Sequence, residues 1–404
     1  MKKCIFLLMG ILIFQNANSQ HKLVESNNDF AFKIYKATKS DSSNYFISPF
    51  SLNIALAIAN EGAASATRRE MDDLLSIENI GERTSLYSKL MLRTTDLDSV
   101  DFQQCLQWSE NKEGKNSLTI ANSLWINDNF KIDNDFKKSI ESNYNSQIFG
   151  FNKQNLEVTN KAINNWVSRK TNNKMTEVPG IDGSTSLSII NAIHFSGEWE
   201  FPFDKEETRK KKFYMINKKP VYVNYMRIQT MYRYFEDNEI QSIQLPYKCD
   251  QFSMIVILPK KRYGLVSIEQ KLTASFFSKI QSAGSQEIIL SLPKFRIESE
   301  IEPKGEIVKM GYGNMFSDAA DFSGISKNSS LKISRITHKT FIEIDEKKTE
   351  AAAVTKIDVV TGYGGGEPAP PPPPKIFNAD HPFMFLIVDN RTGAIIFTGR
   401  FVRD

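Results

Sequence analysis

TEAAAVTKIDVVTGYGGGEPAPPPPP, residues 349–374, is the stretch that decides the fold. In its first half, every second residue from Thr349 to Thr361 is uncharged, and the three charged residues fall between them. This period of two predicts a strand with one face made for burial. The glycines and prolines of residues 362–374 cannot form a central strand, because glycine costs backbone entropy and proline donates no ladder hydrogen bond. A strand that can be buried therefore ends in an exposed tether; the alternative is a surface strand that leads into a low-complexity linker.

The residues after this stretch predict a buried β-hairpin that closes the chain. Two apolar runs, FNADHPFMFLIVD (377–389) and TGAIIFTGR (392–400), are separated by the turn residues 390–393. Apolar runs joined by a short glycine-containing turn are typical of a hairpin. The segment 349–361 is therefore followed by a strand pair that belongs to the core.

The order of several further segments resembles the serpin family of protease inhibitors. The matching segments are NYFISPFS (44–51), NAIHFSGEW (191–199), LPY (245–247), SMIVILP (253–259), ITHKTFIE (336–343) and EKKTEAAA (346–353). The resemblance extends from about residue 25 to Asp404. Each segment alone is a weak signal, but so many in the same order are an improbable coincidence.

The predicted fold is a single α+β domain over residues 20–404. No Pro/Gly/Ser-rich linker divides this range, and periodicity places most helices in its first half and most strands in its second. Among the helices is an apolar one at residues 52–59, with Ser48 and Ser51 near its start. The resemblance implies a serpin fold: a large central β-sheet, two further sheets, about eight to nine helices and an exposed reactive-centre loop at about 346–376.

Residues 1–19 are predicted to be a secretory signal peptide. Lys2 and Lys3 precede an apolar run from Cys4 to Phe14, and small residues follow at 17–19. The run is shorter than the ~20 apolar residues of a membrane span. We therefore expect a secreted, extracellular protein; the alternative is a cytosolic protein with an apolar N-terminal helix.

The charge balance argues against nucleic-acid and membrane partners. Without Lys2 and Lys3, 49 basic residues stand against 47 acidic ones, so no long-range field favours a polyanion. The one compact basic cluster, residues 209–212, is predicted to be a solvated turn or sheet edge, with a polyanion site as the alternative. We expect a monomer, because an exposed loop and an open sheet make self-association hazardous.

The sequence offers no catalytic or metal-binding motif, and we expect neither an enzyme nor a cofactor. The four histidines lack a second metal-type residue at usable spacing, and no nucleophile or phosphate-binding motif occurs. Cys105 and Cys249, the two cysteines after residue 19, either form a disulfide or stay buried and reduced.

The resemblance assigns residues to three groups. Those that match the family's hinge are Glu346, Lys348, Thr349, Glu350, Ala351, Ala352 and Ala353. Those that match its buried polar cluster, where the central sheet must part, are Ser48, Ser51, Asn191 and His338, with Trp199 at the top of the gap. Lys294 matches the lysine that pairs with the hinge glutamate, and we expect this pair to be exposed. Counting from Glu346 as in the family places the reactive bond at Gly362-Tyr363, with Thr361 as a flanking candidate.

These assignments imply a suicide inhibitor of chymotrypsin- or elastase-like serine proteases. A target protease would cleave the loop and form a covalent acyl-enzyme, and residues 349–361 would then insert into the central sheet and trap it. Lys348 departs from the pattern, because inhibitory members usually have glycine there. A non-inhibitory serpin that acts as a carrier, a chaperone or a cleaved substrate is therefore the alternative.

Overall fold

The structure is a computed structural model that describes residues 2–40, 42–108, 115–215, 219–327, 331–346 and 372–402, with side chains described from residue 19 onward. Within these ranges the chain forms ten α-helices, two of which have only six residues, close to the eight or nine expected. The helices are α1 (Lys2–Thr38), α2 (Pro49–Glu61), α3 (Ser65–Leu75), α4 (Arg83–Thr95), α5 (Val100–Trp108), α6 (Asn134–Tyr144), α7 (Leu156–Lys170), α8 (Leu265–Gln270), α9 (Ala274–Gln281) and α10 (Lys304–Lys309). Helix α1 includes part of the predicted signal peptide, whose removal stays a prediction.

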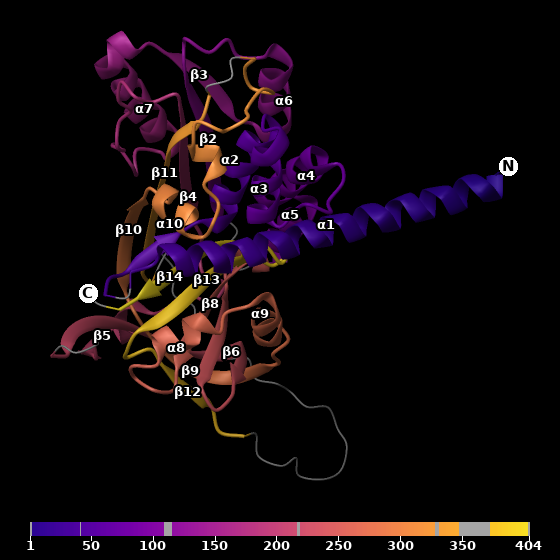
Figure 1. Ribbon diagram of the computed structural model, residues 1–404. Helices are drawn as coiled ribbons and strands as arrows, with labels where there is room; N and C mark the ends of the chain where they lie inside the picture. The colour runs from indigo at the N-terminus through magenta and orange to yellow at the C-terminus, as the bar shows by residue number, and fades with distance from the viewer. Residues whose placement is uncertain are drawn as a thin grey trace.

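Five strands form the central sheet, in the order β10-β11-β4-β2-β3 (Figure 1). Their bounds are β2 (Ser117–Asn127), β3 (Gln147–Phe151), β4 (Leu187–Ser196), β10 (Phe295–Ile301) and β11 (Ile333–Ile344). The neighbours β4 and β11 run parallel, whereas β2 pairs with β4 and β10 pairs with β11 in antiparallel fashion. The middle of the sheet is therefore a parallel pair between antiparallel neighbours.

The remaining described strands form one sheet, where the sequence predicts two. They are β1 (Tyr45–Ile47), β5 (Arg209–Phe213), β6 (Val221–Glu236), β7 (Ile240–Pro246), β8 (Phe252–Pro259), β9 (Ser285–Pro293), β12 (Lys375–Asn378), β13 (Phe383–Asp389) and β14 (Ile395–Phe401). The sixteen-residue strand β6 pairs with β9 along its middle and with β7 at its end. It thereby joins the two expected sheets into one nine-stranded sheet.

The predicted hairpin and the predicted apolar helix both contribute to the hydrophobic core. Strands β13 and β14 are buried throughout, and Gly393 in their turn has φ +79°, a conformation that favours glycine. Helix α2 begins after Ser48, whose side chain accepts a hydrogen bond from the Ser51 N–H, and Pro49 occupies its first turn. It is buried along nearly its whole length and contacts β14 of the nine-stranded sheet and β4 and β2 of the central sheet.

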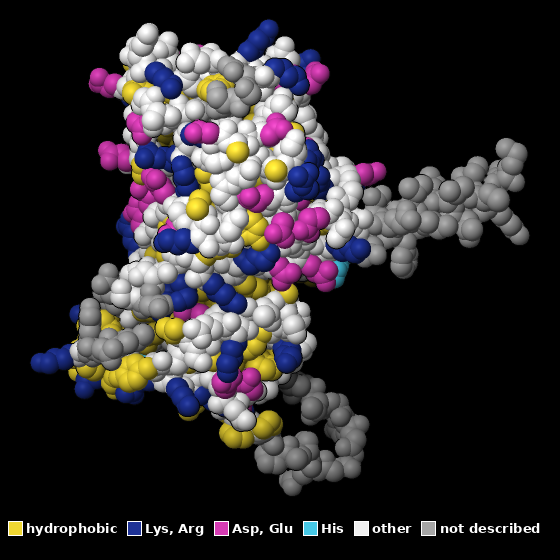
Figure 2. Space-filling view, in the orientation of Figure 1, with side chains coloured by type: hydrophobic (Ala, Val, Ile, Leu, Met, Phe, Trp, Pro, Cys, Tyr) yellow, Lys and Arg dark blue, Asp and Glu magenta, His cyan; other side chains and the backbone are white. Residues whose placement is uncertain are grey.

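The basic cluster at residues 209–212 is a sheet edge, as the sequence predicts. It forms most of β5, which among the described strands pairs only with the start of β6, and all four side chains are exposed. Figure 2 shows Lys and Arg side chains projecting where Figure 1 places β5. Lysines on an edge strand discourage pairing with another chain, which accounts for the cluster without a ligand.

Candidate functional site

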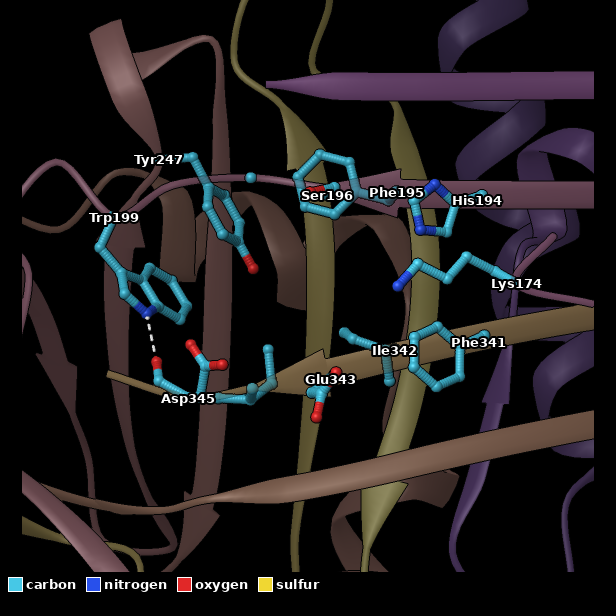
Figure 3. A pocket seen from close by; sticks show the side chains of 12 residues that line it. Lys174, His194, Phe195, Ser196, Trp199, Tyr247, Phe341, Ile342, Glu343 and Asp345 are labelled. Atoms are coloured by element: carbon cyan, nitrogen blue, oxygen red, sulfur yellow. Dashed lines mark hydrogen bonds between the residues drawn. The ribbon is translucent and has the colours of Figure 1, made fainter. Parts of the chain in front are cut away.

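The strands β4 and β11 pair over most of their length and then part. Their parallel register runs from Leu187 opposite Ile333 to His194 opposite Phe341, and β11 continues to Ile344 without a partner on this side. A cavity of about 70 Å³ lies where they part (Figure 3). It is lined by Lys174, His194, Phe195, Ser196, Gly197, Trp199, Tyr247, Phe341, Ile342, Glu343, Ile344 and Asp345. We call this opening the gap.

The gap lies where a segment that follows β11 would meet the sheet. A chain that leaves β11 and turns back would lie antiparallel to both β11 and β4. It would replace one parallel pair with two antiparallel pairs, and antiparallel pairing is slightly more stable per residue. The thirteen residues 349–361 match the twelve residues of β11 in length. The topology therefore provides a place for this segment.

An aromatic contact closes the top of the gap. The Trp199 ring stacks on the Tyr247 ring, with centroids 4.5 Å apart and planes inclined by 11°. The Trp199 indole N–H donates a hydrogen bond to the Asp345 carbonyl oxygen at 3.0 Å, across the gap (Figure 3). Trp199 thus lies at the top of the gap, where the sequence places it, and connects the β4 side with the end of β11.

Lys294 and Glu346 meet at the start of the loop, but the pair is not exposed as expected. Lys294 Nζ lies 2.6 Å from a Glu346 carboxylate oxygen, and the Thr208 hydroxyl donates to the other oxygen at 2.6 Å. The Glu346 side chain is only 5% exposed and that of Lys294 34%, because the segment around Thr208 covers the carboxylate. Burial alone would raise the pKa of Glu346, but the hydrogen bonds from Lys294 and Thr208 hold it below its usual value.

Four predicted residues form a buried hydrogen-bonded cluster, which we call the latch: Ser48, Ser51, Asn191 and His338, together with Asn122. His338 lies on β11 opposite Asn191 on β4, and the His338 Nδ1 and Asn191 Oδ1 atoms are hydrogen-bonded. The Asn191 amide donates to the Ser51 hydroxyl oxygen at 2.5 Å and to Asn122 Oδ1 on β2. The latch therefore connects three neighbouring strands of the central sheet with helix α2.

The latch requires a neutral histidine. The Ser48 N–H donates to His338 Nε2 at 3.0 Å, so this nitrogen must be the acceptor and Nδ1 must carry the proton that is donated to Asn191. Protonation of Nε2 would replace the acceptor with a second donor. The ring is fully buried, and this desolvation lowers the pKa of His338 from 6.5 to about 3.

We expect acid to destabilise the uncleaved protein through His338. Its pKa is lower in the folded chain, so the unfolded chain binds the extra proton between pH 6.5 and about 3, and stability falls as pH falls through this window. Between pH 7.5 and 4.5 the loss is about 2–3 kcal/mol. Urea unfolding of the wild-type protein and of the His338→Gln variant at both pH values measures it. Equal losses in the two proteins would contradict the assignment.

Several contacting residues are not assigned to the site from the sequence, although Tyr247 lies in the matching segment 245–247. Asn122, Thr208 and Tyr247 meet their partners across 69, 138 and 48 residues of chain, respectively. Cys105 and Cys249, whose pairing the sequence leaves open, form a disulfide with Cα atoms 5.9 Å apart. Each contact depends on the relative placement of distant segments.

The predicted hinge after Glu346 and the predicted reactive bond lie outside the described residues. They comprise Lys348, Thr349, Glu350, Ala351, Ala352, Ala353, Thr361, Gly362 and Tyr363. Among the residues that the structure does describe, no three His, Cys, Asp or Glu side chains gather into a possible metal site. No helix in the described part of the chain combines the length and apolar character needed to cross a membrane.

Comparisons with known proteins agree with this geometry. The family described as Serpin (serine protease inhibitor) matches residues 25–403. Intracellular coagulation inhibitor 1 of Tachypleus tridentatus is 34% identical, over 94% of this chain and 88% of its own. Human Serpin B3 is 31% identical, over 94% of this chain and 99% of its own. Human thyroxine-binding globulin, crystallised with thyroxine, has 25% identity and a TM-score of 0.80, over 95% of this chain and 99% of its own.

The serpin family matches nearly the whole chain, and the fold is shared with the solved structure of thyroxine-binding globulin. Both findings agree with the order of the matching segments between residues 44 and 400. The chain therefore belongs to the serpin family, whose members include inhibitors of proteases.

Proposed function

We propose that this serpin is a secreted, monomeric suicide inhibitor of chymotrypsin- or elastase-like serine proteases. The protease's serine oxygen attacks the carbonyl carbon of the residue before the cleaved bond and forms an ester. The peptide bond breaks, and the following residue leaves with a new amino terminus. Residues 349–361 then insert between β4 and β11 and carry the attached protease with them before water can hydrolyse the ester.

The observation that carries this proposal is the parallel pair β4–β11 with the gap at its end. Insertion of residues 349–361 would place their seven uncharged alternate positions on one face of the central sheet and their charges on the other. Three of the first residues to enter are alanines, which fit without overpacking the core. The uncleaved chain would therefore be kinetically trapped above a more stable inserted state.

The proposed reactive bond is Gly362-Tyr363. This bond follows Gly362, the sixteenth residue after Glu346. We count from Glu346 because the depth of the sheet limits how many residues after the hinge can insert. Cleavage after Tyr363 would suit a chymotrypsin-like enzyme, and cleavage after Thr361 or Gly362 an elastase-like one. Trypsin-like enzymes are disfavoured, because Lys356 lies before this site and Lys375 well after it.

The test is to mix residues 20–404 with chymotrypsin, elastase or trypsin and to analyse the products on denaturing gels and by intact mass. The proposal expects a denaturant-stable adduct with chymotrypsin or elastase, together with loss of protease activity. The mass of the released C-terminal peptide identifies the bond. Cleavage without an adduct by every enzyme, and no gain in thermal stability of the cleaved chain, would refute inhibition by insertion.

A non-inhibitory role remains the second candidate, because Lys348 stands at a hinge position where glycine eases the turn. A lysine there is expected to slow insertion, so that part of the protease completes hydrolysis and leaves active. We expect the Lys348→Gly variant to form adduct from a larger fraction of cleaved chains. The measurement is the number of inhibitor molecules consumed per protease inactivated; an unchanged or higher number would contradict the role assigned to Lys348.

A further inference from the structure

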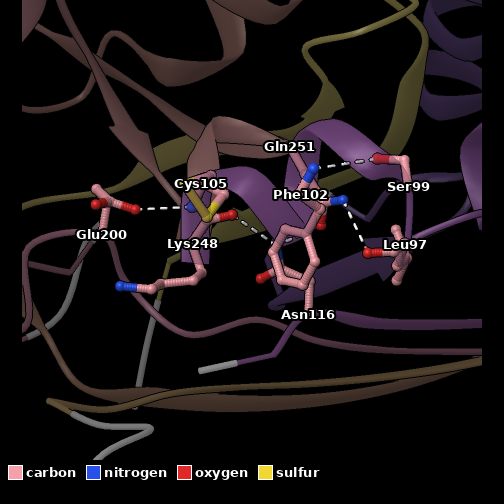
Figure 4. Close-up of a disulfide and its surroundings, with 9 residues drawn as sticks. Leu97, Ser99, Phe102, Cys105, Asn116, Glu200, Lys248 and Gln251 are labelled. Carbon is pink, nitrogen blue, oxygen red and sulfur yellow. Dashed lines mark hydrogen bonds between the residues drawn. A yellow bond between two sulfur atoms is a disulfide. The ribbon is translucent and has the colours of Figure 1, made fainter. Parts of the chain in front are cut away.

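The disulfide joins two parts of the fold that support different sheets. Cys105 lies on α5, which precedes β2 of the central sheet, and Cys249 lies in the turn between β7 and β8 of the nine-stranded sheet (Figure 4). We call residues 247–251 the turn. The bond spans 144 residues of chain, so it is a covalent connection between segments that are otherwise distant in sequence.

The central sheet has one side that is fixed to the nine-stranded sheet. Strand β1 pairs with β14 and also contacts the β10–β11 pair: Phe46 N–H donates to the Ser299 hydroxyl at 3.0 Å, and the Thr340 hydroxyl donates to the Phe46 carbonyl at 2.6 Å. Strands β2 and β3 are hydrogen-bonded to β4 or to each other. Opening between β4 and β11 would therefore move β4, β2 and β3 away from the rest.

The turn makes non-covalent contacts with the end of β4. The Lys248 N–H donates to the Glu198 carbonyl at 2.7 Å, and the Glu200 N–H donates to the Pro246 carbonyl at 3.0 Å. The Cys249 N–H donates to a Glu200 carboxylate oxygen at 2.7 Å (Figure 4). These bonds, like the stacking of Trp199 on Tyr247, can break and form again as strands move.

The turn also holds the segments on both sides of α5. The Asn116 side-chain amide donates to the Lys248 carbonyl at 2.9 Å and to the Gln251 side-chain oxygen at 3.0 Å. Gln251 donates in turn to the Leu97 carbonyl at 3.1 Å. Helix α5 and the approach to β2 are therefore docked on the turn, and the disulfide is the one covalent bond among these described contacts.

The disulfide cannot follow a movement of the size that insertion requires. A new strand needs about 4.8 Å of additional space between its neighbours. The Cα atoms of Cys105 and Cys249 are 5.9 Å apart, and a disulfide tolerates at most about 6.8 Å. If α5 moved with β2, the two Cα atoms could separate by only about 0.9 Å more, which is about one fifth of the 4.8 Å that a new strand needs. With the disulfide intact, α5 therefore cannot follow β2 over the whole shift, and opening has to separate β2 from α5.

We propose that the Cys105–Cys249 disulfide is a covalent brake on the opening of the central sheet between β4 and β11. The inference rests on the proposed function, because it concerns the rate of the same insertion. A dithiol reductant releases the brake: it donates two electrons and two protons, Cys105 and Cys249 become thiols, and the reductant forms its own disulfide. Both cysteines are partly exposed, so thiols in solution can reach the bond.

A synthetic peptide of residues 349–361 tests the brake without a protease. It is added to uncleaved residues 20–404, and native gels with intact mass follow the formation of the one-to-one complex. We expect the Cys105→Ser/Cys249→Ser variant, and wild-type protein reduced with a dithiol, to take up the peptide roughly tenfold faster than the oxidised protein. Reoxidation of the reduced wild-type protein is expected to restore the slow rate.

The Asn116→Ala variant is the matched control. It removes the two hydrogen bonds from Asn116 to the turn and keeps the disulfide, so its rate is expected to rise less than that of the double serine variant. Equal rates in the oxidised and reduced wild-type protein would overturn the brake, and so would a variant Asn116→Ala as fast as the double serine variant. If no form takes up the peptide, the insertion mechanism itself fails, and the brake fails with it.

Discussion

An aspartate in place of Thr355 is expected to convert the inhibitor into a substrate. Thr355 lies on the uncharged face of residues 349–361, the face that insertion would bury. Burial of an unpaired carboxylate costs several kcal/mol, which slows insertion by about a thousandfold. The protease would then complete hydrolysis first. The measurement is the yield of denaturant-stable adduct with the protease that the wild-type protein inhibits, and we expect almost none from the Thr355→Asp variant.

The neighbouring Lys356 provides the matched control for this prediction. Lys356→Asp introduces the same side chain one residue later, on the face that already carries charges. A period of two sends adjacent side chains to opposite faces, so this aspartate would remain in water. We expect Lys356→Asp to form adduct at close to the wild-type yield. Equal yields from the two aspartate variants would show that the two faces are not distinguished and would contradict insertion as a strand.

The parts of the fold that the sequence predicts are those with local patterns. The apolar runs at residues 377–389 and 392–400, separated by turn residues 390–393, predict a hairpin, and the hairpin is present in the structure. The run after Ser48 predicts a buried helix, because a cap and an apolar segment are both readable within a few residues. Such patterns are contained in a few neighbouring residues and can be recognised without knowledge of distant contacts.

The parts that the sequence misses depend on distant contacts. No local pattern shows that β6 pairs with β9 along its middle and with β7 at its end and so merges two sheets. The pairing of Cys105 with Cys249 and the cover of Glu346 by Thr208 likewise follow from the folded arrangement. Four of the five latch residues could be anticipated because they lie in segments that match the family, whereas Asn122 could not; on its own, His338 is one histidine in an apolar strand.

A buried ionic cluster fastens the nine-stranded sheet to the helices that cover it. The Glu269 carboxylate on α8 is fully buried and accepts a hydrogen bond from the Tyr35 hydroxyl of α1 at 2.6 Å. Arg400 of β14, also fully buried, lies 3.3 Å from the other carboxylate oxygen, and the Lys39 ammonium lies 3.2 Å from it. Burial and the nearby Glu269 charge raise the pKa of Tyr35 well above its usual value, so its hydroxyl remains a donor.

Replacement of Glu269 by alanine is expected to destabilise the uncleaved protein by about 3–5 kcal/mol, because the buried Arg400 would lose its ion pair with this carboxylate. The matched control is Glu239→Ala, which removes an ion pair with Lys271 whose two side chains are about half exposed. That change should cost less than about 1 kcal/mol, since water solvates the remaining lysine. Urea unfolding followed by circular dichroism compares the two variants. Equal losses in the two variants would contradict the role assigned to Glu269 as the buried counter-charge that holds α1, α8 and β14 together.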